Sequence, residues 1–255
     1  FLSQFDIIKD VSINGIARIY QVENFNGRFA LVIEDFNAIS LKEYLKETLE
    51  LKKFLNIAIK LSETIGDLHK NNIIHKNLNP ENILINPETM QIKITDFGAA
   101  SLISQEIASP NFQDKSLLYI SPEQTGRMNR PVDYRTDFYS LGVICYEMLT
   151  GELPFKSRDA MELIHFHIAK SPQPPHKVVK DIPRVISDII MKLLAKNPEE
   201  RYKSGYGLKL DFELCLEKLI SKGKIENIIP GKFDAPDIFQ IFHNLYGRES
   251  EISLI

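Results

Sequence analysis

The sequence predicts an α+β fold in which a few short strands accompany a mostly helical body. Short apolar runs bounded by polar or turn-forming residues indicate strands, and they lie at 16–22, 31–36, 83–85 and 92–94. Apolar residues recur at helical spacing over 51–68, which indicates an amphipathic helix with one face in the core. The segment 139–149 is apolar almost all round, as in a helix buried in the middle of a domain.

Each remaining element follows from a local signal. The apolar run at 16–22 reads as the partner strand of 31–36. The turn-forming residues Asn-Pro-Glu-Thr separate the two later strands. Gly151 and Pro154 end the buried helix, because glycine adopts a left-handed backbone and proline cannot continue a helix. Apolar periodicity predicts further helices at about 159–170, 184–195 and 206–220.

Composition and charge exclude several classes of protein. The 31 basic and 34 acidic residues nearly balance and form no long basic run, which argues against nucleic-acid binding. The two cysteines lie in helical patterns, so neither a disulfide framework nor a zinc site is expected. His165 and His167 fall on different faces of one predicted helix, a poor geometry for one metal ion. No apolar run reaches the roughly 18 residues of a membrane span, and no signal peptide is recognisable, so a cytoplasmic setting is expected.

Residues 75–83 and 94–98 carry the most informative motifs. They read His-Lys-Asn-Leu-Asn-Pro-Glu-Asn-Ile and, across a short hairpin, Ile-Thr-Asp-Phe-Gly. This pair of motifs resembles the catalytic loop, His-Arg-Asp-Leu-Lys-Pro-x-Asn, and the metal-binding turn, Asp-Phe-Gly, of protein kinases. In that family the loop Asp accepts the proton of the substrate hydroxyl, while the loop Asn and the turn Asp hold Mg²⁺ against the phosphates of ATP.

The resemblance assigns roles to four residues of these motifs. Asn77 stands at the position of the catalytic Asp, and Asn79 at that of the loop Lys. An amide does not act as a base near neutral pH, and Asn79 offers no positive charge to the transferring phosphoryl group. Asn82 and Asp96 keep the two metal positions, so ATP and Mg²⁺ are the cofactors that the resemblance implies, although the loop changes put both in doubt.

Other residues of the resemblance hold the catalytic loop in place. His75 and Lys76 open the loop, and His75 is expected to be a structural hydrogen-bonding group rather than an acid or a base. Asp137, in Asp-Phe-Tyr-Ser-Leu-Gly, falls where kinases have an aspartate that accepts backbone N–H groups from the loop. Its implied role is to fix the loop rather than to take part in chemistry.

A second set of matches supports the platform on which a protein substrate would lie. Glu123, in Ser-Pro-Glu, and Arg201 stand at the positions of an ion pair that anchors this platform in the family. Ser116, in Ser-Leu-Leu-Tyr, resembles the threonine of Thr-x-x-Tyr in serine/threonine kinases, which contacts the catalytic loop. This last match points away from tyrosine kinases.

The first residues resemble the end of a kinase small lobe. Ile33 would be the gatekeeper at the end of the last strand, with Glu34 and Phe36 in the hinge that borders ATP. Gln4 lies where the family usually has a helix glutamate that pairs with a strand lysine, although glutamine is also a common surface helix residue. The family's glycine-rich phosphate loop and strand lysine are expected ahead of this stretch. The resemblance therefore implies an incomplete small lobe without its first strands.

The resemblance also divides the chain. Residues 1–36 would be a partial small lobe, 37–221 the large lobe, 222–243 a linker and 244–255 the start of a following module, for which an ATPase is the candidate. The run 121–137 is similar to the kinase module at the front of large hybrid proteins that combine a kinase, an ATPase and a sensor histidine kinase. Partner domains of the same polypeptide, or a protein substrate, are the partners this implies.

Two functions remain open from the sequence. The favoured one is a serine/threonine-kinase-like signalling module whose catalysis is impaired, because Asn77 replaces the catalytic Asp. The alternative is an active or weakly active kinase that transfers the γ-phosphate of ATP to protein serine or threonine. Loss of a general base typically costs about 10²–10⁴-fold in rate, so slow transfer is compatible with the sequence.

Overall fold

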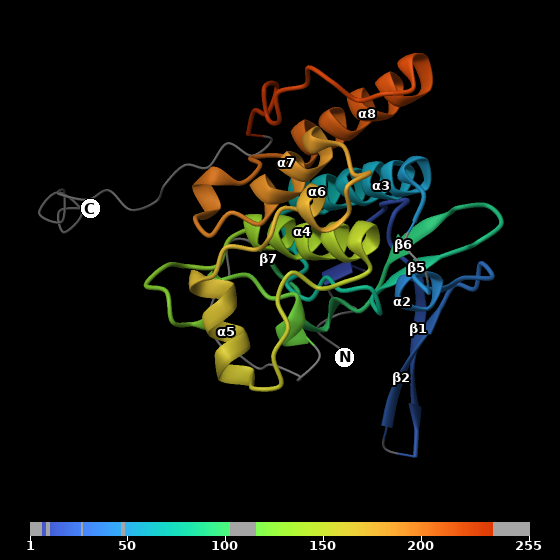
Figure 1. The fold of residues 1–255 in the computed structure, drawn as a ribbon. Helices are drawn as coiled ribbons and strands as arrows, with labels where there is room; N and C mark the ends of the chain where they lie inside the picture. Colours follow the sequence, from blue (N-terminus) through green and yellow to red (C-terminus); the bar gives the residue numbers. More distant parts are fainter. Residues whose placement is uncertain (1–6, 9–10, 27, 47–48, 103–115, 237–255) are drawn as a thin grey trace, which may run out of the picture.

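A computed structural model describes residues 7–8, 11–26, 28–46, 49–102 and 116–236 of the chain. It confirms an α+β fold in which a two-stranded ribbon projects from a mostly helical body (Figure 1). The predicted position of Gln4 and the expected following module at 244–255 lie outside the described residues. Within the described residues, no helix has the length and apolar character needed to cross a membrane.

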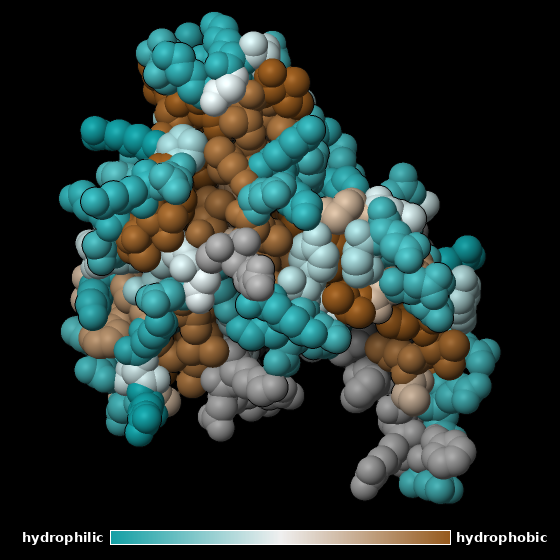
Figure 2. All heavy atoms as spheres, turned by 45° about the vertical axis from the view of Figure 1, so that its right-hand side comes forward, coloured by the Kyte–Doolittle hydropathy of each residue, from teal (hydrophilic) through white to brown (hydrophobic). Residues whose placement is uncertain are grey.

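The projecting ribbon consists of β1 (Ile19–Phe25) and β2 (Arg28–Ile33), which pair antiparallel. β1 lies later than predicted, because it begins three residues after Ile16. β2 lies earlier than predicted, because it ends at Ile33, so Glu34 and Phe36 follow the strand. Ile16 instead forms an isolated parallel bridge to Ile94 in the body, before the chain reaches the ribbon. Figure 2 shows the ribbon standing apart from the body, with hydrophobic surface on it.

The body contains two small sheets. One has the order β3 (Ile39–Ser40), β5 (Ile83–Ile85) and β6 (Ile92–Ile94), and the other pairs β4 (Ile73–Ile74) with β7 (Ser101–Leu102). The strands predicted at 83–85 and 92–94 are therefore confirmed, together with the turn that joins them. These short strands place the predicted catalytic loop between β4 and β5, and the Asp-Phe-Gly turn directly after β6.

The helices of the body confirm the predicted periodicity. The long amphipathic helix is α3 (Leu51–Lys70), and the buried helix is α4 (Arg135–Thr150), which ends at Gly151 with a φ of 71°. The other helices are α2 (Leu41–Tyr44), α5 (Ala160–Ala169), α6 (Pro175–Val178), α7 (Arg184–Leu193) and α8 (Gly205–Lys222). Short 3-10 turns lie at Phe97–Ala99, Ser116–Leu118, Glu123–Thr125 and Pro198–Glu200.

The core surrounds α4 and the faces of α3, α7 and α8 that turn toward it (Figure 1). Helices α3 and α8 meet at two glycines: a Cβ on Gly205 would lie 2.4 Å from the Cα of Gly66, so only glycine permits this approach. A second, smaller apolar cluster lies beneath α5 and comprises Leu117, Ile120, Phe155, Leu163 and Ile164. It supports the segment that leads to the Glu123 turn.

Candidate functional site

Asp137 organises the start of the catalytic loop. It lies in the first turn of α4, and its side chain is fully buried. One carboxylate oxygen accepts hydrogen bonds from the backbone N–H of His75 and from Nε2 of His69, both at 2.9 Å, and the other accepts from the backbone N–H of Lys76 at 2.9 Å. Burial alone would raise the pKa of Asp137, but the hydrogen bonds from His69 and from the backbone N–H of His75 outweigh it and hold that pKa below its usual range.

His75 ties the loop to the turn after β6. The backbone N–H of Asn77 donates to Nδ1 at 3.3 Å, so the ring proton sits on Nε2, 3.0 Å from the carbonyl oxygen of Thr95. The ring also contacts that of Phe97, with centroids 4.8 Å apart. Burial lowers the pKa of His75, which keeps the imidazole neutral and the hydrogen-bond pattern fixed.

Three asparagine side chains of the loop and the Asp96 carboxylate lie close together. Nδ2 of Asn77 donates to Oδ2 of Asp96 at 3.3 Å. Nδ2 of Asn82 and Nδ2 of Asn79 both donate to the backbone oxygen of Asn77, at 2.9 and 3.0 Å. Oδ1 of the Asn79 side chain in turn accepts from the backbone N–H of Glu81 at 2.9 Å. The structure thus brings together the four predicted loop and metal residues, with Asn77 as a donor toward Asp96.

The turn holds the Asp96 carboxylate in a fixed direction. Asp96 has a φ of 61°, a left-handed conformation uncommon outside glycine, and its Oδ1 accepts from the N–H of Gly98 at 3.3 Å. Because Nδ2 of Asn82 donates to the backbone oxygen of Asn77, Oδ1 of Asn82 is the atom available to bind a metal ion. Mg²⁺ usually binds one or two protein oxygens and completes its shell with waters and phosphates. One carboxylate and one amide oxygen fit that mode; the described residues contain no group of three His, Cys, Asp or Glu that would make a protein-only metal cage.

The hinge after β2 is fastened to β6 by an ion pair. Oε1 of Glu34 accepts from the backbone N–H of Arg18 at 2.7 Å and from Nζ of Lys93 at 2.5 Å, and Nζ also lies over the Phe36 ring, 5.6 Å from its centroid. Burial opposes ionisation of Glu34, but Lys93 and Arg18 outweigh it and lower its pKa. Ile33 ends β2 just before this contact. Sequence reasoning missed Lys93, although a lysine inside the strand Ile-Lys-Ile was an available signal.

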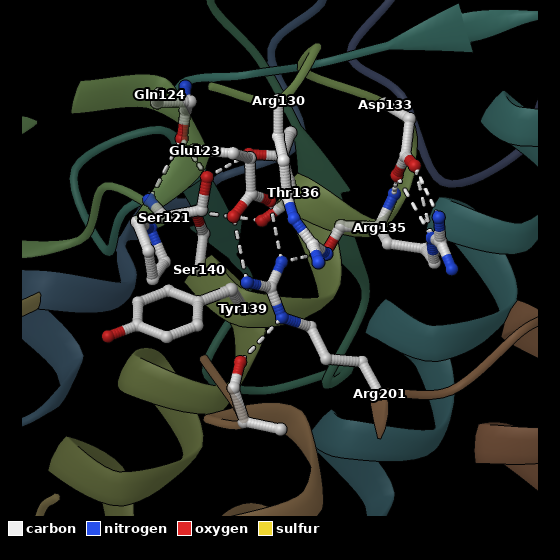
Figure 3. Close-up of polar contacts among 12 residues, drawn as sticks. Ser121, Glu123, Gln124, Arg130, Asp133, Arg135, Thr136, Tyr139, Ser140 and Arg201 are labelled. Atoms are coloured by element: carbon white, nitrogen blue, oxygen red, sulfur yellow. Dashed lines mark hydrogen bonds and ion pairs between the residues drawn. The ribbon is translucent and has the colours of Figure 1, made fainter. Parts of the chain in front are cut away.

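The predicted ion pair of the platform is a two-pronged contact. Arg201 donates to the two carboxylate oxygens of Glu123 at 2.6 and 2.8 Å, and both side chains are almost fully buried (Figure 3). The guanidinium also donates to the backbone oxygens of Ala195 and Arg135 and lies 4.9 Å from the centroid of the Tyr139 ring. All of this stabilises the Glu123 turn against α4 and the segment before α8.

Gln124 links the platform to the catalytic loop, which sequence reasoning did not anticipate. Its Oε1 accepts from the N–H of Ser121 at 3.0 Å, and its Nε2 donates to the backbone oxygen of Lys76 at 2.7 Å. Ser116 begins the 3-10 turn ahead of this segment, and its predicted contact with the loop stays a prediction. A glutamine directly after Ser-Pro-Glu was the only local signal for the link.

Comparisons with known proteins match most of this chain to protein kinases. A family model described as "Protein kinase domain" matches residues 1–212. A probable serine/threonine-protein kinase of Clostridium perfringens is 34% identical over 216 residues, which cover 84% of this chain and 31% of that protein. The serine/threonine-protein kinase PrkC of Bacillus subtilis is 31% identical over 79% of this chain and 31% of its own length. The hybrid signal transduction histidine kinase G of Dictyostelium discoideum is 38% identical over 56% of this chain.

The chain spans less than a third of the length of these relatives, and 5% of the Dictyostelium protein. The family match nevertheless takes in the hinge, the catalytic loop, the Asp-Phe-Gly turn and both members of the Glu123–Arg201 pair. Because it extends over far more than half of the sequence, the chain belongs to the protein kinase family. The Clostridium and Bacillus relatives are serine/threonine-protein kinases, which supports the serine/threonine type.

Proposed function

We propose that this chain is a serine/threonine-kinase-like signalling module that binds a Mg²⁺–nucleotide and is impaired in phosphotransfer. The observation that carries the proposal is the amide of Asn77, which donates a hydrogen bond to Asp96 at the place where a catalytic base would accept a proton. An amide nitrogen has no basic lone pair to take up the proton of a substrate hydroxyl. The loop therefore binds the Mg²⁺–nucleotide but does not take up the proton of a substrate.

The other residues have binding roles in this proposal. Asp96 and Asn82 hold Mg²⁺, and Ile33 with the hinge residues Glu34 and Phe36 borders the nucleotide base. The bound Mg²⁺–ATP would supply the phosphoryl group and neutralise its charge. The chain's own contribution is to keep this pocket ordered, through the neutral ring of His75 and the buried Asp137 beneath it.

The domain division and the partners belong to the same proposal. Residues 1–36 belong to the small lobe and 37–221 to the large lobe, while 222–243 form a connection and 244–255 belong to a following module. The likeness to a hybrid signal transduction histidine kinase supports a histidine kinase module as a partner within one polypeptide. An ATPase module and a cytoplasmic setting are further parts of the proposal. A protein substrate is the partner of the alternative function.

A weakly active serine/threonine kinase is the second candidate, and the order of the site favours it. The buried Glu123–Arg201 pair and the three hydrogen bonds to Asp137 hold the substrate platform and the loop in place without the catalytic Asp. Positioning and charge stabilisation alone contribute much of phosphoryl-transfer catalysis. The change Asn77→Asp in a protein extended upstream should raise phosphorylation of a serine or threonine peptide by roughly 10²-fold or more; no gain would argue against this candidate.

Thermal unfolding with and without Mg²⁺–ATP tests nucleotide binding. The chain, an upstream-extended protein and the Asp96→Ala variant of each are compared, with Asp188→Ala as a control because Asp188 is an exposed acid on α7. A ligand at 100 times its Kd adds about 2.7 kcal/mol of stability. We expect stabilisation that requires both Mg²⁺ and Asp96 and survives in the control. No stabilisation in either protein would contradict nucleotide binding.

A further inference from the structure

The chain beyond α8 folds back onto the start of that helix, in the red-orange segment of Figure 1. Asp234 reaches the residues ahead of α8: its Oδ1 accepts from the N–H and the hydroxyl of Ser204 at 3.1 and 3.0 Å, and its Oδ2 accepts from the N–H of Lys203 at 2.7 Å. A carboxylate at this end of a helix meets unpaired N–H groups and a favourable helix dipole. We call residues 225–234 the C-terminal clasp.

The clasp is fixed at further points. Asp211 of α8, itself buried, accepts from the N–H of Gly231 at 2.6 Å and from the hydroxyl of Tyr202 at 2.5 Å. Ile225 at the other end of the clasp is buried in the main core. A Cβ on Gly207 would lie 2.8 Å from the Cα of Asp234, so a glycine is required for the clasp to come this close. The family match stops at residue 212, so the clasp lies outside it.

A continuous set of contacts joins the clasp to the catalytic loop. The peptide of Lys203 is held from both sides, because its N–H donates to Asp234 and its carbonyl oxygen accepts from the hydroxyl of Tyr134 at 3.0 Å. The Tyr134 ring packs edge-on against His69, with centroids 5.2 Å apart. His69 in turn donates to Asp137, whose carboxylate holds the loop by two backbone N–H groups.

We propose that Asp234 is a positioning residue for the catalytic loop. With the clasp docked, Lys203 fixes Tyr134, Tyr134 fixes His69, and the Asp137 carboxylate keeps the direction that orders the loop. Undocking of the clasp releases the first of these contacts and loosens the loop, so a force or partner acting on the chain after α8 regulates the site. Coupling over such a distance requires evidence that one element changes when the other is altered. The consequence for nucleotide binding rests on the proposed function, but the coupling to the loop does not.

Amide hydrogen exchange measures the coupling directly, with four variants. Asp234→Ala removes the clasp contact, Tyr134→Phe removes only the hydroxyl that meets Lys203, and the double variant combines them. Asp159→Ala is the matched control, because Asp159 caps α5 by accepting from the N–H of Glu162 at 2.8 Å. It deletes an equivalent cap at a helix that does not belong to the set of contacts.

We expect Asp234→Ala to speed exchange at Lys203 and Ser204 and, at least about threefold, at the His75 and Lys76 amides. In the Tyr134→Phe background the same change should add nothing at the loop, since interacting residues give non-additive effects. The control should alter exchange only near α5. Unchanged exchange at His75 and Lys76 in Asp234→Ala would overturn the proposal, as would additive effects of the two changes.

A binding measurement separates this proposal from the proposed function. If the unaltered protein binds Mg²⁺–ATP, Asp234→Ala should weaken binding several-fold and Asp159→Ala should not; equal affinities in all three would overturn the positioning role. If the unaltered protein binds no nucleotide, only the nucleotide function fails, and the exchange rates of the loop amides still decide whether Asp234 positions it.

Discussion

The side-chain amide of Asn77 donates to the carboxylate of Asp96 across 3.3 Å, where the protein kinase pattern sets two carboxylates near one another. Two like charges at this distance repel and need a metal ion or a shared proton between them. An amide at one of the two positions removes that requirement. The turn after β6 therefore stays attached to the loop without help from a cation.

Asn77→Asp should make the stability of the protein depend on Mg²⁺ and on pH. The new carboxylate faces Asp96, so at pH 7 we expect an unfolding free energy on the order of 1–2 kcal/mol below that of the unaltered protein. This difference between the two proteins should shrink with Mg²⁺, or when both are measured at a pH nearer 4. Asn77→Ala is the control, since it removes the same hydrogen bond without adding a charge. Urea unfolding with and without Mg²⁺ checks this, and an identical Mg²⁺ response of the two variants would contradict it.

Arg201→Met should be severely destabilising. It leaves the Glu123 carboxylate buried without its partner, and loss of one member of a buried pair typically costs about 3–5 kcal/mol. The double change Glu123→Gln with Arg201→Met should recover much of that loss, because neither position then carries a buried charge. Urea unfolding at neutral pH measures both.

A second ion pair from the same region serves as the control for Arg201. Arg130 and Glu199 lie 2.9 Å apart, but their side chains are 43% and 60% exposed. Arg130→Met should therefore cost about 0–1 kcal/mol. Equal costs at the buried and the exposed pair would show that burial is not what makes the Glu123 contact matter.

His167 should give the protein an acid-sensitive stability. Burial and the neighbouring Lys196 lower the pKa of His167 to about 4, from an unfolded value of 6.5. The unfolded chain thus binds a proton that the folded protein resists, so stability is full above pH 6.5 and is lost as the pH falls from there toward 4. The loss is about 1.4 kcal/mol per pH unit well inside that window.

His167→Gln should flatten this slope while its amide keeps a contact with the Tyr139 hydroxyl, which lies 3.0 Å from Nδ1. A residual slope of the same sign remains, because burial also lowers the pKa of His75. His165→Gln is the matched control, since His165 lies two residues away on the exposed face of α5. Urea unfolding between pH 7 and 5 distinguishes them; equal slopes for the two variants would count against a buried neutral His167.

Gln124→Met should weaken the join between the platform and the loop. It leaves the backbone oxygen of Lys76 without this donor, which costs roughly 1–3 kcal/mol for a buried group and less where water can reach it. Gln21→Met is the control, because the Gln21 amide bonds only to the exposed side chain of Glu23 among the contacts described for it. Faster exchange of the loop amides in the first variant alone would support the assignment, and equal exchange in both would refute it.

The sequence by itself determined the elements whose signal is local. Apolar spacing predicted the helices at 51–68, 139–149 and about 206–220, which the structure extends to Leu51–Lys70, Arg135–Thr150 and Gly205–Lys222. The helix predicted at about 159–170 placed His165 and His167 on different faces, and in the structure His165 is exposed and His167 is buried. The loop and turn motifs identified the family because residue types at fixed spacing can be recognised without knowing what those residues contact. The ends of β1 and β2 were misplaced, since an apolar run does not record where strand pairing begins.

Only the tertiary structure decided which distant side chains meet. Lys93 binds Glu34 at a separation of 59 residues in the sequence, Gln124 binds Lys76 at a separation of 48, and Asp234 binds Lys203 at a separation of 31. Nothing in the local sequence fixes such pairings, because they depend on how helices and strands pack before a hydrogen bond of about 3 Å can form. The sequence determined which residues a kinase-like site contains. Packing determined that Asn77 contacts Asp96 and that the C-terminal clasp contacts the start of α8.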